Sequence, residues 1–353
     1  MPSPVGIVSP IEFAFLEDGR QSAEATAELL AAFLSESKSS LEIAIYDLRL
    51  AGAAGTILLD AVKAASARGV QVRVVFNQVP PRKEPSPPPS EVDWDLVKQM
   101  GVPFHPVSGV PDLMHHKYVI RDRTAVWTGS TNWTTDSWTR EENVIVRILS
   151  AELAADYLAD FEVLWTTRDV AASGKFSAAW IELPGIRLRP YFSPGRGQKM
   201  SHEIAHRISA ATRRVRIASP VLTSGPVLGT LAELVATPRS DLGGIYDRTQ
   251  MEAVQRQWSQ NQLSAWKLEA FRSVAASGRF ASKVTTPYAA GSVHDFMHAK
   301  MTVADDTVFV GSYNLSHSGE MNAENVVEIE NAPLADLCAA YIDRIMEKYR
   351  VTA

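Results

Sequence analysis

The hydrophobic positions of the first half of the chain predict helices and strands in alternation. Residues 22–34 have the spacing of an amphipathic helix, and they lead into the apolar run LEIAIYDL, which begins at Leu41. A second helix is predicted over 55–68, and the run that begins at Val70 is rich in β-branched residues, as buried strands are. A further helix is expected over 151–165. Such an alternation predicts a sheet that is covered by helices.

The second half repeats this order. Residues 201–211 have helical spacing and lead into the run VRIASPVL, which begins at Val215, and residues 244–247 echo the second strand of the first half. We therefore predict an α/β fold in which a mixed, mostly parallel sheet flanked by helices occurs once in each half. The two similar lobes are expected to span 1–175 and 176–353.

Two segments depart from the repeated pattern. Residues 80–89, PPRKEPSPPP, cannot form a helix or a central strand, because proline fixes φ and lacks an N–H donor, so an exposed loop is expected there. Residues 248–283 contain many helix formers and are predicted to be helical. Their aromatic residues, Trp258, Trp266 and Phe271, are expected to pack in the core.

A short motif is also written twice. Residues 114–122 read MHHKYVIRD and residues 297–305 read MHAKMTVAD, and each is followed by Gly-Ser-x-Asn and then by Glu-Asn. The offset between the copies is 183 residues for the first three polar positions and 182 for the rest. The paired polar residues are His115, Lys117, Asp122, Ser130, Asn132 and Glu142 in the first copy, and His298, Lys300, Asp305, Ser312, Asn314 and Glu324 in the second.

Side chains two residues apart in a strand share a face, so His115 and Lys117 are expected to project together, as are His298 and Lys300. A phosphate ester needs such a pair, because an imidazole can attack or transfer a proton and a fixed cation offsets charge on the phosphoryl oxygens. His116 has no counterpart at this spacing. It is expected to point to the opposite face and to have a structural role.

The remaining polar members of the motif follow hydrophobic strands. The runs AVWTG and TVFVG end at the two Gly-Ser-x-Asn segments. The strand ends therefore place Ser130 with Asn132, and Ser312 with Asn314, where they could add neutral donors to the same phosphoryl oxygens. Three fixed positions alone recur by chance, but two copies followed by the same downstream residues do not. A duplicated fold that has lost its activity is the alternative.

Charge and cysteine content narrow the class of protein. The net charge is −5, but residues 187–283 contain 15 Lys and Arg against 6 Asp and Glu, a local balance of +9 that suits a phosphate-bearing substrate. Cys338 is the single cysteine and is predicted to lie in the core, without a disulfide. No signal peptide and no membrane-spanning run are recognised, so a cytoplasmic protein is expected.

The two motifs resemble the HKD motifs of the phospholipase D superfamily, and the resemblance extends over the whole chain. It implies two lobes related by a pseudo-twofold axis, with both motifs meeting in one site. It also implies a ping-pong reaction through a phosphohistidine, with neither metal nor cofactor. Metal catalysis is the chemical alternative, but it needs clusters of acidic and histidine ligands. Because each half supplies its own motif, a monomer is expected.

The resemblance also suggests a role for each residue. His115 would be the nucleophile and His298 the general acid and base, although the symmetry of the sequence leaves the reverse order open. Glu142 and Glu324 would orient the histidines, as a carboxylate does in a catalytic triad. Asp122 and Asp305 would stabilise the loops of the motifs. The phosphoryl oxygens would be held by Lys117, Lys300, Asn132 and Asn314.

The motifs indicate the reaction but not the substrate. The segment GSTNWTTDSWTREEN resembles nuclease-like members of the superfamily, and Trp133 and Trp138 could stack on bases, an interaction of about 1–3 kcal/mol each. With the basic stretch at 187–283, these features favour nucleic acid over phospholipid. The alternatives are a soluble phospholipase or transphosphatidylase acting on phospholipid head groups, and a module that binds a phosphate-bearing ligand without turnover.

Overall fold

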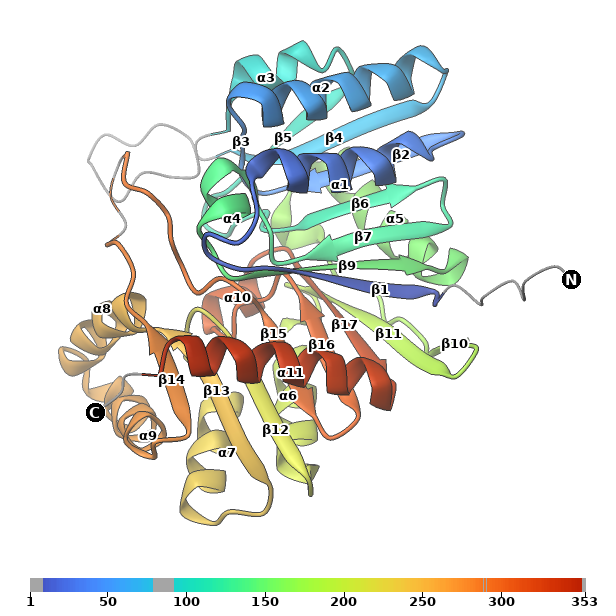
Figure 1. The fold of residues 1–353 in the computed structure, drawn as a ribbon. Coiled ribbons are helices and arrows are strands. Elements are labelled where there is room, and N and C mark those ends of the chain that lie inside the picture. Colours follow the sequence, from blue (N-terminus) through green and yellow to red (C-terminus); the bar gives the residue numbers. More distant parts are fainter. Residues whose placement is uncertain (1–8, 79–91, 288, 290, 351–353) are drawn as a thin grey trace, which may run out of the picture.

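The computed structural model describes residues 9–78, 92–287, 289 and 291–350. Within them the chain forms two large sheets, one in each half, with helices packed on both (Figure 1). The α/β class and the repetition of the lobe are therefore confirmed. The loop expected over 80–89 lies outside the described residues.

The first sheet has seven strands, and the strand that carries the first motif lies at its centre. The helices of this half include α1 (Ala23–Ser35), α2 (Gly52–Ala67) and α5 (Ala151–Thr167), with the shorter α3 (Trp94–Gln99) and α4 (Thr135–Thr139). A small separate ladder joins β3 (Leu48–Arg49) to β8 (Trp133–Thr134). In spatial order the sheet consists of β1 (Ile11–Leu16), β9 (Asn143–Leu149), β7 (Ala125–Gly129), β6 (Lys117–Arg121), β2 (Ser40–Ile45), β4 (Gln71–Gln78) and β5 (Phe104–Ser108).

The second sheet has the same strand order with one additional edge strand. The 3₁₀ turn η1 (Val170–Ala172) precedes it. Its strands are β10 (Ile181–Leu183), β11 (Ile186–Ser193), β17 (Glu324–Glu330), β16 (Thr307–Gly311), β15 (Met301–Ala304), β12 (Arg214–Ala218), β13 (Asp241–Asp247) and β14 (Phe280–Lys283). Its helical elements are α6 (Gly197–Ala210), α7 (Gly225–Ala236), α8 (Arg248–Ser259), η2 (Gln262–Ser264), α9 (Ala265–Ala276), α10 (His317–Met321) and α11 (Ala332–Lys348).

The parallel part of each sheet is smaller than the alternation of strands and helices suggests. Only β2, β4 and β5, and likewise β12, β13 and β14, pair in parallel. The other ladders of both sheets are antiparallel. The cause is local, since the chain returns from β6 to β7 and from β15 to β16 through turns too short for a parallel crossover.

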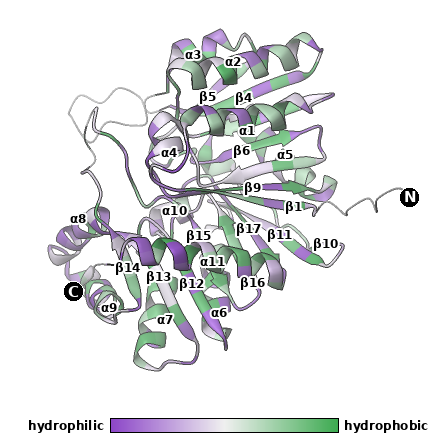
Figure 2. Ribbon diagram, in the orientation of Figure 1, coloured by the Kyte–Doolittle hydropathy of each residue, from purple (hydrophilic) through white to green (hydrophobic). Residues whose placement is uncertain are grey.

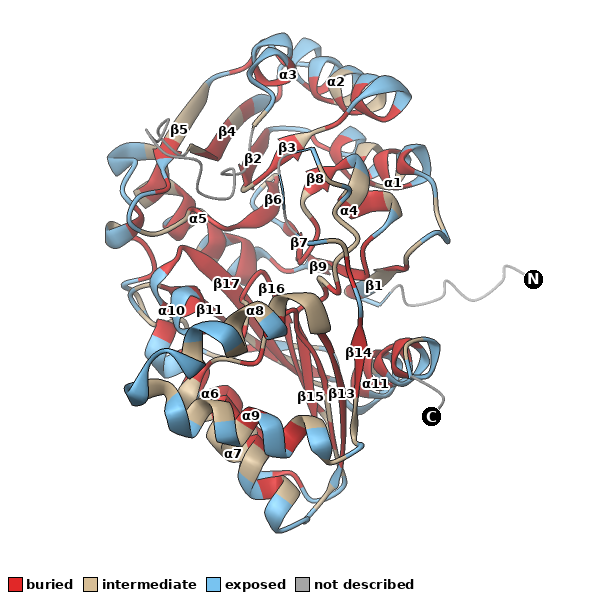
Figure 3. Cartoon of the chain, turned by 90° about the vertical axis from the view of Figure 1, so that its left-hand side faces the viewer, coloured by how far each residue is buried: buried red, intermediate tan, exposed pale blue. Residues whose placement is uncertain are grey.

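Several helices begin at a side-chain cap, and the helices bury their apolar faces on the sheets. The Ser22 side chain accepts a hydrogen bond from the backbone at the start of α1, and Ser150 does so at the start of α5. Figure 2 shows the apolar residues concentrated on the strands and inner helix faces, and Figure 3 shows the strands buried between helices with exposed outer faces. Cys338 is buried in the core, as predicted.

The two lobes share one of the hydrophobic clusters of the core. The largest hydrophobic cluster contains residues of both sheets, together with α5 and α11. Helix α5 also contacts β11 of the second sheet. The Tyr341 hydroxyl on α11 donates to the backbone oxygens of Leu16 and Asn143 in the first lobe, each at 3.3 Å. This shared packing fixes the position of one motif relative to the other.

Candidate active site

Each motif strand begins at the lobe interface, where it is hydrogen-bonded to the other lobe. The His115 N–H, just before β6, donates to the Ala323 oxygen at 2.9 Å. The His298 N–H, just before β15, donates to the Glu142 oxygen at 3.0 Å. Isolated bridges join the neighbouring residues across the same interface. The sequence motifs, 183 residues apart, are thereby brought to one place.

A pocket of about 260 Å³ lies at this meeting point. Both lobes line it, and both histidines and both asparagines of the motifs face it. The lining consists of Tyr46, Asp47, His115, Asn132, Glu141, Pro220, Gln250, His294, Phe296, His298 and Asn314. The geometry therefore brings both motifs together in a single site.

His115 is held by a carboxylate from the other lobe. Its Nδ1 lies 2.8 Å from the Glu324 carboxylate, which is fully buried. The Tyr46 ring packs edge-on against the imidazole, with 4.5 Å between ring centroids. With Nδ1 engaged, Nε2 is the nitrogen left to face the pocket, which is the arrangement that a nucleophilic imidazole requires.

His298 is held differently. Its Nδ1 lies 3.2 Å from the Asn143 side-chain oxygen and 3.3 Å from the Glu141 carboxylate. The Asn143 amide nitrogen in turn donates to Glu141 at 2.9 Å. The two histidines are therefore inequivalent, because His115 has a close carboxylate whereas His298 shares an amide oxygen and a more distant carboxylate.

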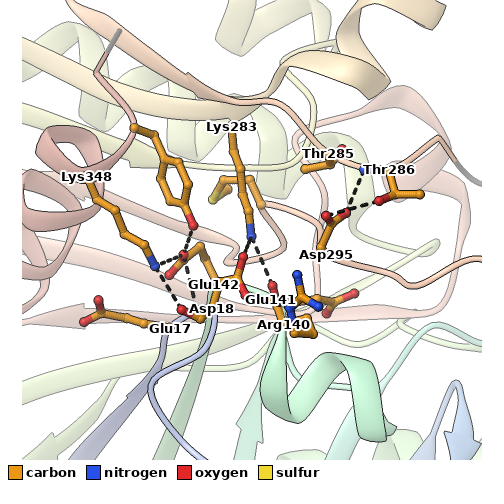
Figure 4. Close-up of polar contacts among 12 residues, drawn as sticks. Glu17, Asp18, Arg140, Glu141, Glu142, Lys283, Thr285, Thr286, Asp295 and Lys348 are labelled. Carbon is orange, nitrogen blue, oxygen red and sulfur yellow. Dashed lines mark hydrogen bonds and ion pairs between the residues drawn. The ribbon is translucent and has the colours of Figure 1, made fainter. Parts of the chain in front are cut away.

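Among the described residues the Glu142 carboxylate forms no contact with a motif histidine, which corrects the orienting role that the resemblance implies. The Glu142 carboxylate instead accepts hydrogen bonds from Lys348 at 3.0 Å and from the Tyr349 hydroxyl at 2.5 Å. It also accepts one from the Asp18 N–H. Figure 4 shows these contacts, with Glu141 beside them. Glu142 thus joins α11 to the first lobe.

A one-residue difference in strand register explains why the Glu142 side chain does not contact His298 while the side chains of its two neighbours do. In the second lobe Gly311 pairs with Val326, so the repeat predicts that Gly129 pairs with Val144. Gly129 pairs instead with Ile145. Because neighbouring side chains of a strand point to opposite faces, a shift of one residue changes which side chain faces the histidine. Asn143 therefore occupies the place that Glu324 has in the second lobe.

The two lysines lie behind the pocket wall. Lys117 is 2% exposed and Lys300 is 3% exposed. The Lys117 ammonium donates to the His115 oxygen at 2.6 Å, and the Lys300 ammonium donates to the His298 oxygen at 2.8 Å. The Lys117 ammonium also lies 4.7 Å from the centre of the Tyr46 ring. Histidine and lysine of each motif thus share one face, as the spacing predicts.

Burial shifts the pKa values of the histidines, lysines and glutamates around the pocket. Burial lowers the pKa of His115 and of His298 well below the usual value for histidine, and the neighbouring lysine charges lower both further. Burial also lowers the pKa of Lys117 to about 7. It raises the pKa of Glu141 and of Glu324 to about 7. At neutral pH both imidazoles are therefore neutral, and several groups can exchange protons when a ligand binds.

Binding of sulfate, as a phosphate mimic, is expected to take up protons above pH 7. The pKa of Lys117 is about 7, so this ammonium is partly deprotonated there, and a bound anion restores its charge. Calorimetry at pH 8 in two buffers of different ionisation enthalpy should give an uptake of roughly one proton, decreasing below pH 7. Because burial lowers the pKa of Lys300 as well, Lys117→Met should reduce the uptake, and Lys117→Met/Lys300→Met should remove most of it. Sulfate binding with no proton uptake at pH 8 would contradict the expected ionisation.

The motif aspartates lie at the far end of the motif strands. The Asp122 carboxylate accepts hydrogen bonds from the backbone N–H groups of Lys38, Ser39 and Ser40. Asp305 accepts the equivalent bonds from the loop before β12. Partial burial alone would raise the pKa of both aspartates, but these N–H groups hold it below the usual value. Their contacts are those of loop-stabilising residues.

Asp305→Asn is expected to lower stability with little effect on turnover. The native carboxylate accepts several N–H bonds, and losing its charge should cost about 1–2 kcal/mol of unfolding free energy at this partly exposed position. Because its folded pKa is lowered, this contribution exists above the unfolded pKa near 3.8 and is lost as the pH falls through the folded pKa. Urea denaturation at pH 7 and pH 3, with kcat measured beside it, tests this. A kcat loss above tenfold at unchanged stability would refute the role.

The serines and asparagines of the motifs have separate places. The Ser130 hydroxyl donates to the Asn143 oxygen at 2.6 Å, and the Ser312 hydroxyl accepts from the Asn325 N–H at 3.0 Å. Both serines are fully buried and hold the start of the following strand rather than lining the pocket. Asn132 and Asn314 do line it. Among the described residues, their side-chain oxygens are buried without a hydrogen-bond partner.

His116 and the two tryptophans belong to the interior. The His116 Nε2 lies 3.0 Å from the Asp160 carboxylate, and both side chains are fully buried. His116 therefore points away from the pocket, as expected from alternation. Trp133 is 2% exposed and Trp138 is 1% exposed. Neither indole presents a surface on which a base could stack, which removes one argument for nucleic acid.

The basic stretch at 187–283 divides into two parts. Between 187 and 239 seven of nine Lys and Arg residues form ion pairs, most with carboxylates from elsewhere in the second lobe. Arg216, for example, pairs with Asp241 and Asp343, each at 2.5 Å. The excess of positive charge between 187 and 239 is thus largely neutralised, which weakens a second argument for nucleic acid. Between 248 and 279, by contrast, no basic residue forms an ion pair within the described part of the chain.

Several lining residues were not predicted. Tyr46 and Asp47 follow β2, and His294 and Phe296 precede the second motif. Gln250 lies in the first turn of α8. None of these side chains is repeated at the equivalent position of the other half, so a search for repeated residues could not find them. Each of these segments adjoins the end of a predicted strand, and this position was the only feature of the sequence that indicated a place near the site.

Two further observations concern cofactors and membranes. Among the residues that the structure describes, no three His, Cys, Asp or Glu side chains are grouped as a metal site would require. Of the helices in the described part of the chain, none is both long enough and apolar enough to span a bilayer.

In a comparison with known proteins, one family matches each half of the chain separately. The family described as "Cardiolipin synthase, PLD-like domain" matches residues 30–165 and 204–346. A mitochondrial cardiolipin hydrolase from Xenopus tropicalis is 26% identical over 183 residues, which are 48% of this chain and 77% of that protein.

Solved structures agree in fold. A phosphatidylserine synthase from Haemophilus influenzae superposes with a TM-score of 0.69 at 16% identity, and the match covers 97% of this chain and 86% of that one. A polyphosphate kinase from Porphyromonas gingivalis superposes with a TM-score of 0.56 at 12% identity, over 94% of this chain and 50% of that one.

Proposed function

This chain is a phosphodiesterase of the phospholipase D superfamily, and on that premise we propose that it cleaves phospholipid head-group diesters by double displacement, without a metal ion. The observation that carries the proposal is the pair of inequivalent histidines lining one pocket, each held through Nδ1 by the other lobe. Two groups so placed suit a reaction that needs a nucleophile on one side of phosphorus and a proton donor on the other.

In the first step the His115 Nε2 attacks phosphorus. A P–N bond forms, the P–O bond to the leaving alcohol breaks, and His298, which takes up a proton when the anionic diester binds, gives that proton to the leaving oxygen. His115 is assigned the attack because the Glu324 carboxylate at 2.8 Å stabilises the positive charge that the ring acquires. The weaker contacts of His298 suit a group that must gain and lose a proton in each cycle.

In the second step water attacks the phosphohistidine. His298 accepts a proton from the water, the new P–O bond forms, and the P–N bond breaks to release His115. An acceptor alcohol in place of water would give transfer by the same route. Lys117 and Lys300 would offset charge on the phosphoryl oxygens, and Asn132 and Asn314 would supply neutral donors to them.

Phospholipid is preferred to nucleic acid as the substrate for two reasons. The buried Trp133 and Trp138 and the ion-paired arginines of 187–239 take away the features that favoured nucleic acid. The similar proteins described above include a cardiolipin hydrolase and a phosphatidylserine synthase, and both names refer to phospholipids.

The test is a parallel assay in chelator with purified protein. Dispersed short-chain cardiolipin and phosphatidylglycerol, single-stranded DNA and RNA are offered in turn, with His115→Asn as the inactive control. Release of a phosphatidyl product by the wild type alone would support the proposal. Cleavage of nucleic acid without cleavage of any phospholipid would restore the nucleic-acid hypothesis, and activity that depends on added divalent ions would refute the metal-free mechanism.

A further inference from the structure

The connection between β13 and β14 forms a helical hairpin that the first lobe does not repeat in its described residues. It comprises α8, η2 and α9, whereas the described part of the connection between β4 and β5 contains only the six-residue α3. Figure 1 shows α8 and α9 beside each other at the edge of the second lobe. We call residues 248–276 the α8–α9 hairpin.

The α8–α9 hairpin adjoins the pocket. Gln250, in its first turn, lines the pocket. Near its tip, the Lys267 ammonium donates to the Thr223 oxygen at 3.4 Å, and Thr223 lies three residues beyond Pro220, another lining residue. The Trp266 ring approaches Gly225, the first residue of α7, where an added Cβ would lie 3.6 Å from the ring. Any external surface that the α8–α9 hairpin contacts would therefore lie beside the pocket.

The tip of the hairpin exposes large apolar side chains. Leu263 in η2 is 86% exposed, the highest value among the large hydrophobic residues of the described chain, and Trp266 is 48% exposed. Trp266 was expected to pack in the core, so its position is a correction to the sequence analysis. A leucine and a tryptophan at the end of a hairpin are the side chains that enter the boundary between lipid head groups and acyl chains.

The hairpin also carries cations that no carboxylate neutralises. Residues 248–276 contain four basic and two acidic residues, a balance of +2. Within the described part of the chain none of the four forms an ion pair, in contrast to most arginines of 187–239. Arg256 and Arg272 are exposed on its two helices. Positive charge beside apolar side chains complements an anionic bilayer.

We propose that the α8–α9 hairpin docks the protein on the surface of an anionic phospholipid bilayer, with Leu263 and Trp266 inserted, and so brings the pocket to its substrate. The inference rests on the proposed phospholipid substrate. A nucleic acid would also attract the cations, but it offers no apolar layer in which to bury Leu263. The bilayer meets both the charge and the apolar tip.

The test measures binding to vesicles without turnover. Wild-type protein should sediment with vesicles of phosphatidylcholine containing about one third phosphatidylglycerol, and much less with pure phosphatidylcholine. The double variant Leu263→Ser/Trp266→Ser should bind the anionic vesicles at least about tenfold more weakly, from the loss of two inserted side chains. The double variant Arg256→Gln/Arg272→Gln should lose about fivefold for each charge.

Matched controls come from the same lobe. Leu337, 46% exposed on α11, is replaced by serine, and Arg239, which pairs with Glu233, is replaced by glutamine. Both variants should bind as the wild type does. Failure of the wild type to bind anionic vesicles, or equal binding by the hairpin variants, would overturn the proposal. So would loss of self-association in the hairpin variants, seen by sedimentation velocity, with vesicle binding unchanged.

Activity on dispersed short-chain phosphatidylglycerol separates this inference from the proposed function. The hairpin variants should hydrolyse the dispersed substrate at the wild-type rate and lose activity only on vesicles. If the wild type cleaves no phospholipid in either form, the proposed function fails, whatever the vesicle binding. If the hairpin variants lose activity equally on both forms, docking is refuted while the proposed chemistry stands.

Discussion

His298→Asn is expected to abolish turnover and to trap the phosphohistidine on His115. With bis(p-nitrophenyl) phosphate the leaving group needs no proton, so the first step should still proceed. The second step needs a base to activate water, and without it kcat should fall about 10³–10⁴-fold. Rapid mixing should show one burst of p-nitrophenol per enzyme. Intact-protein mass should show the added p-nitrophenyl phosphoryl group, labile to acid as a phosphoramidate is.

His115→Asn is the matched variant and should give neither burst nor adduct, because the group that forms the P–N bond is missing. The contrast decides an assignment that the symmetric motifs leave open. A burst and an adduct in His115→Asn, with neither in His298→Asn, would reverse the order of the two histidines. Full activity in either variant would refute a single site built from both motifs.

The features that the sequence predicted well are those that the two motif copies share. Alternation along a strand requires His115 and Lys117 to face one way and His116 the other, and this follows from backbone geometry alone. The buried pair of His116 and Asp160 and the common face of the motif residues agree with it. The repeat likewise predicted the two lobes, because equivalent sequences fold into equivalent elements.

The orienting group of His298 could not be read from the repeat. Sequence spacing aligns Glu142 with Glu324, and no feature of the amino-acid sequence indicates that the pairing of β9 with β7 is shifted by one residue. Register depends on the contacts of both neighbouring strands, β1 and β7, and on the turn that precedes β9. Glu141 and Asn143, the two neighbours of the expected residue, consequently contact the histidine.

Composition favoured nucleic acid on grounds that the folded structure does not support. A local balance of +9 counts charges without showing which carboxylates from outside the stretch lie opposite them, and those of Glu328, Glu330 and Asp343 neutralise part of it. Trp133 and Trp138 next to the motif suggested stacking, yet both fill the interior. Long-range pairing and burial are properties of the folded chain, so a count along the sequence cannot supply them.

Glu324→Gln is expected to lower kcat about 10²–10⁴-fold with the fold preserved. Its carboxylate is fully buried 2.8 Å from the His115 Nδ1, where it fixes the tautomer and stabilises the charge that develops when Nε2 attacks phosphorus. Glutamine keeps the shape but provides no charge, and its amide can present a donor to Nδ1. Steady-state kinetics on a dispersed phospholipid, with a thermal melt to verify folding, measure the effect.

Glu142→Gln is the decisive control, because the repeat aligns Glu142 with Glu324 while the structure places it elsewhere. It should weaken the contacts with Lys348 and Tyr349, lowering stability by about 1–3 kcal/mol at this buried site, and leave kcat within about threefold. Glu141→Gln, by contrast, should slow turnover at unchanged stability, since Glu141 lies beside the His298 Nδ1. If Glu142→Gln instead lost as much activity as Glu324→Gln, the register of β9 described above would be wrong, and the repeat would have identified the orienting residue correctly.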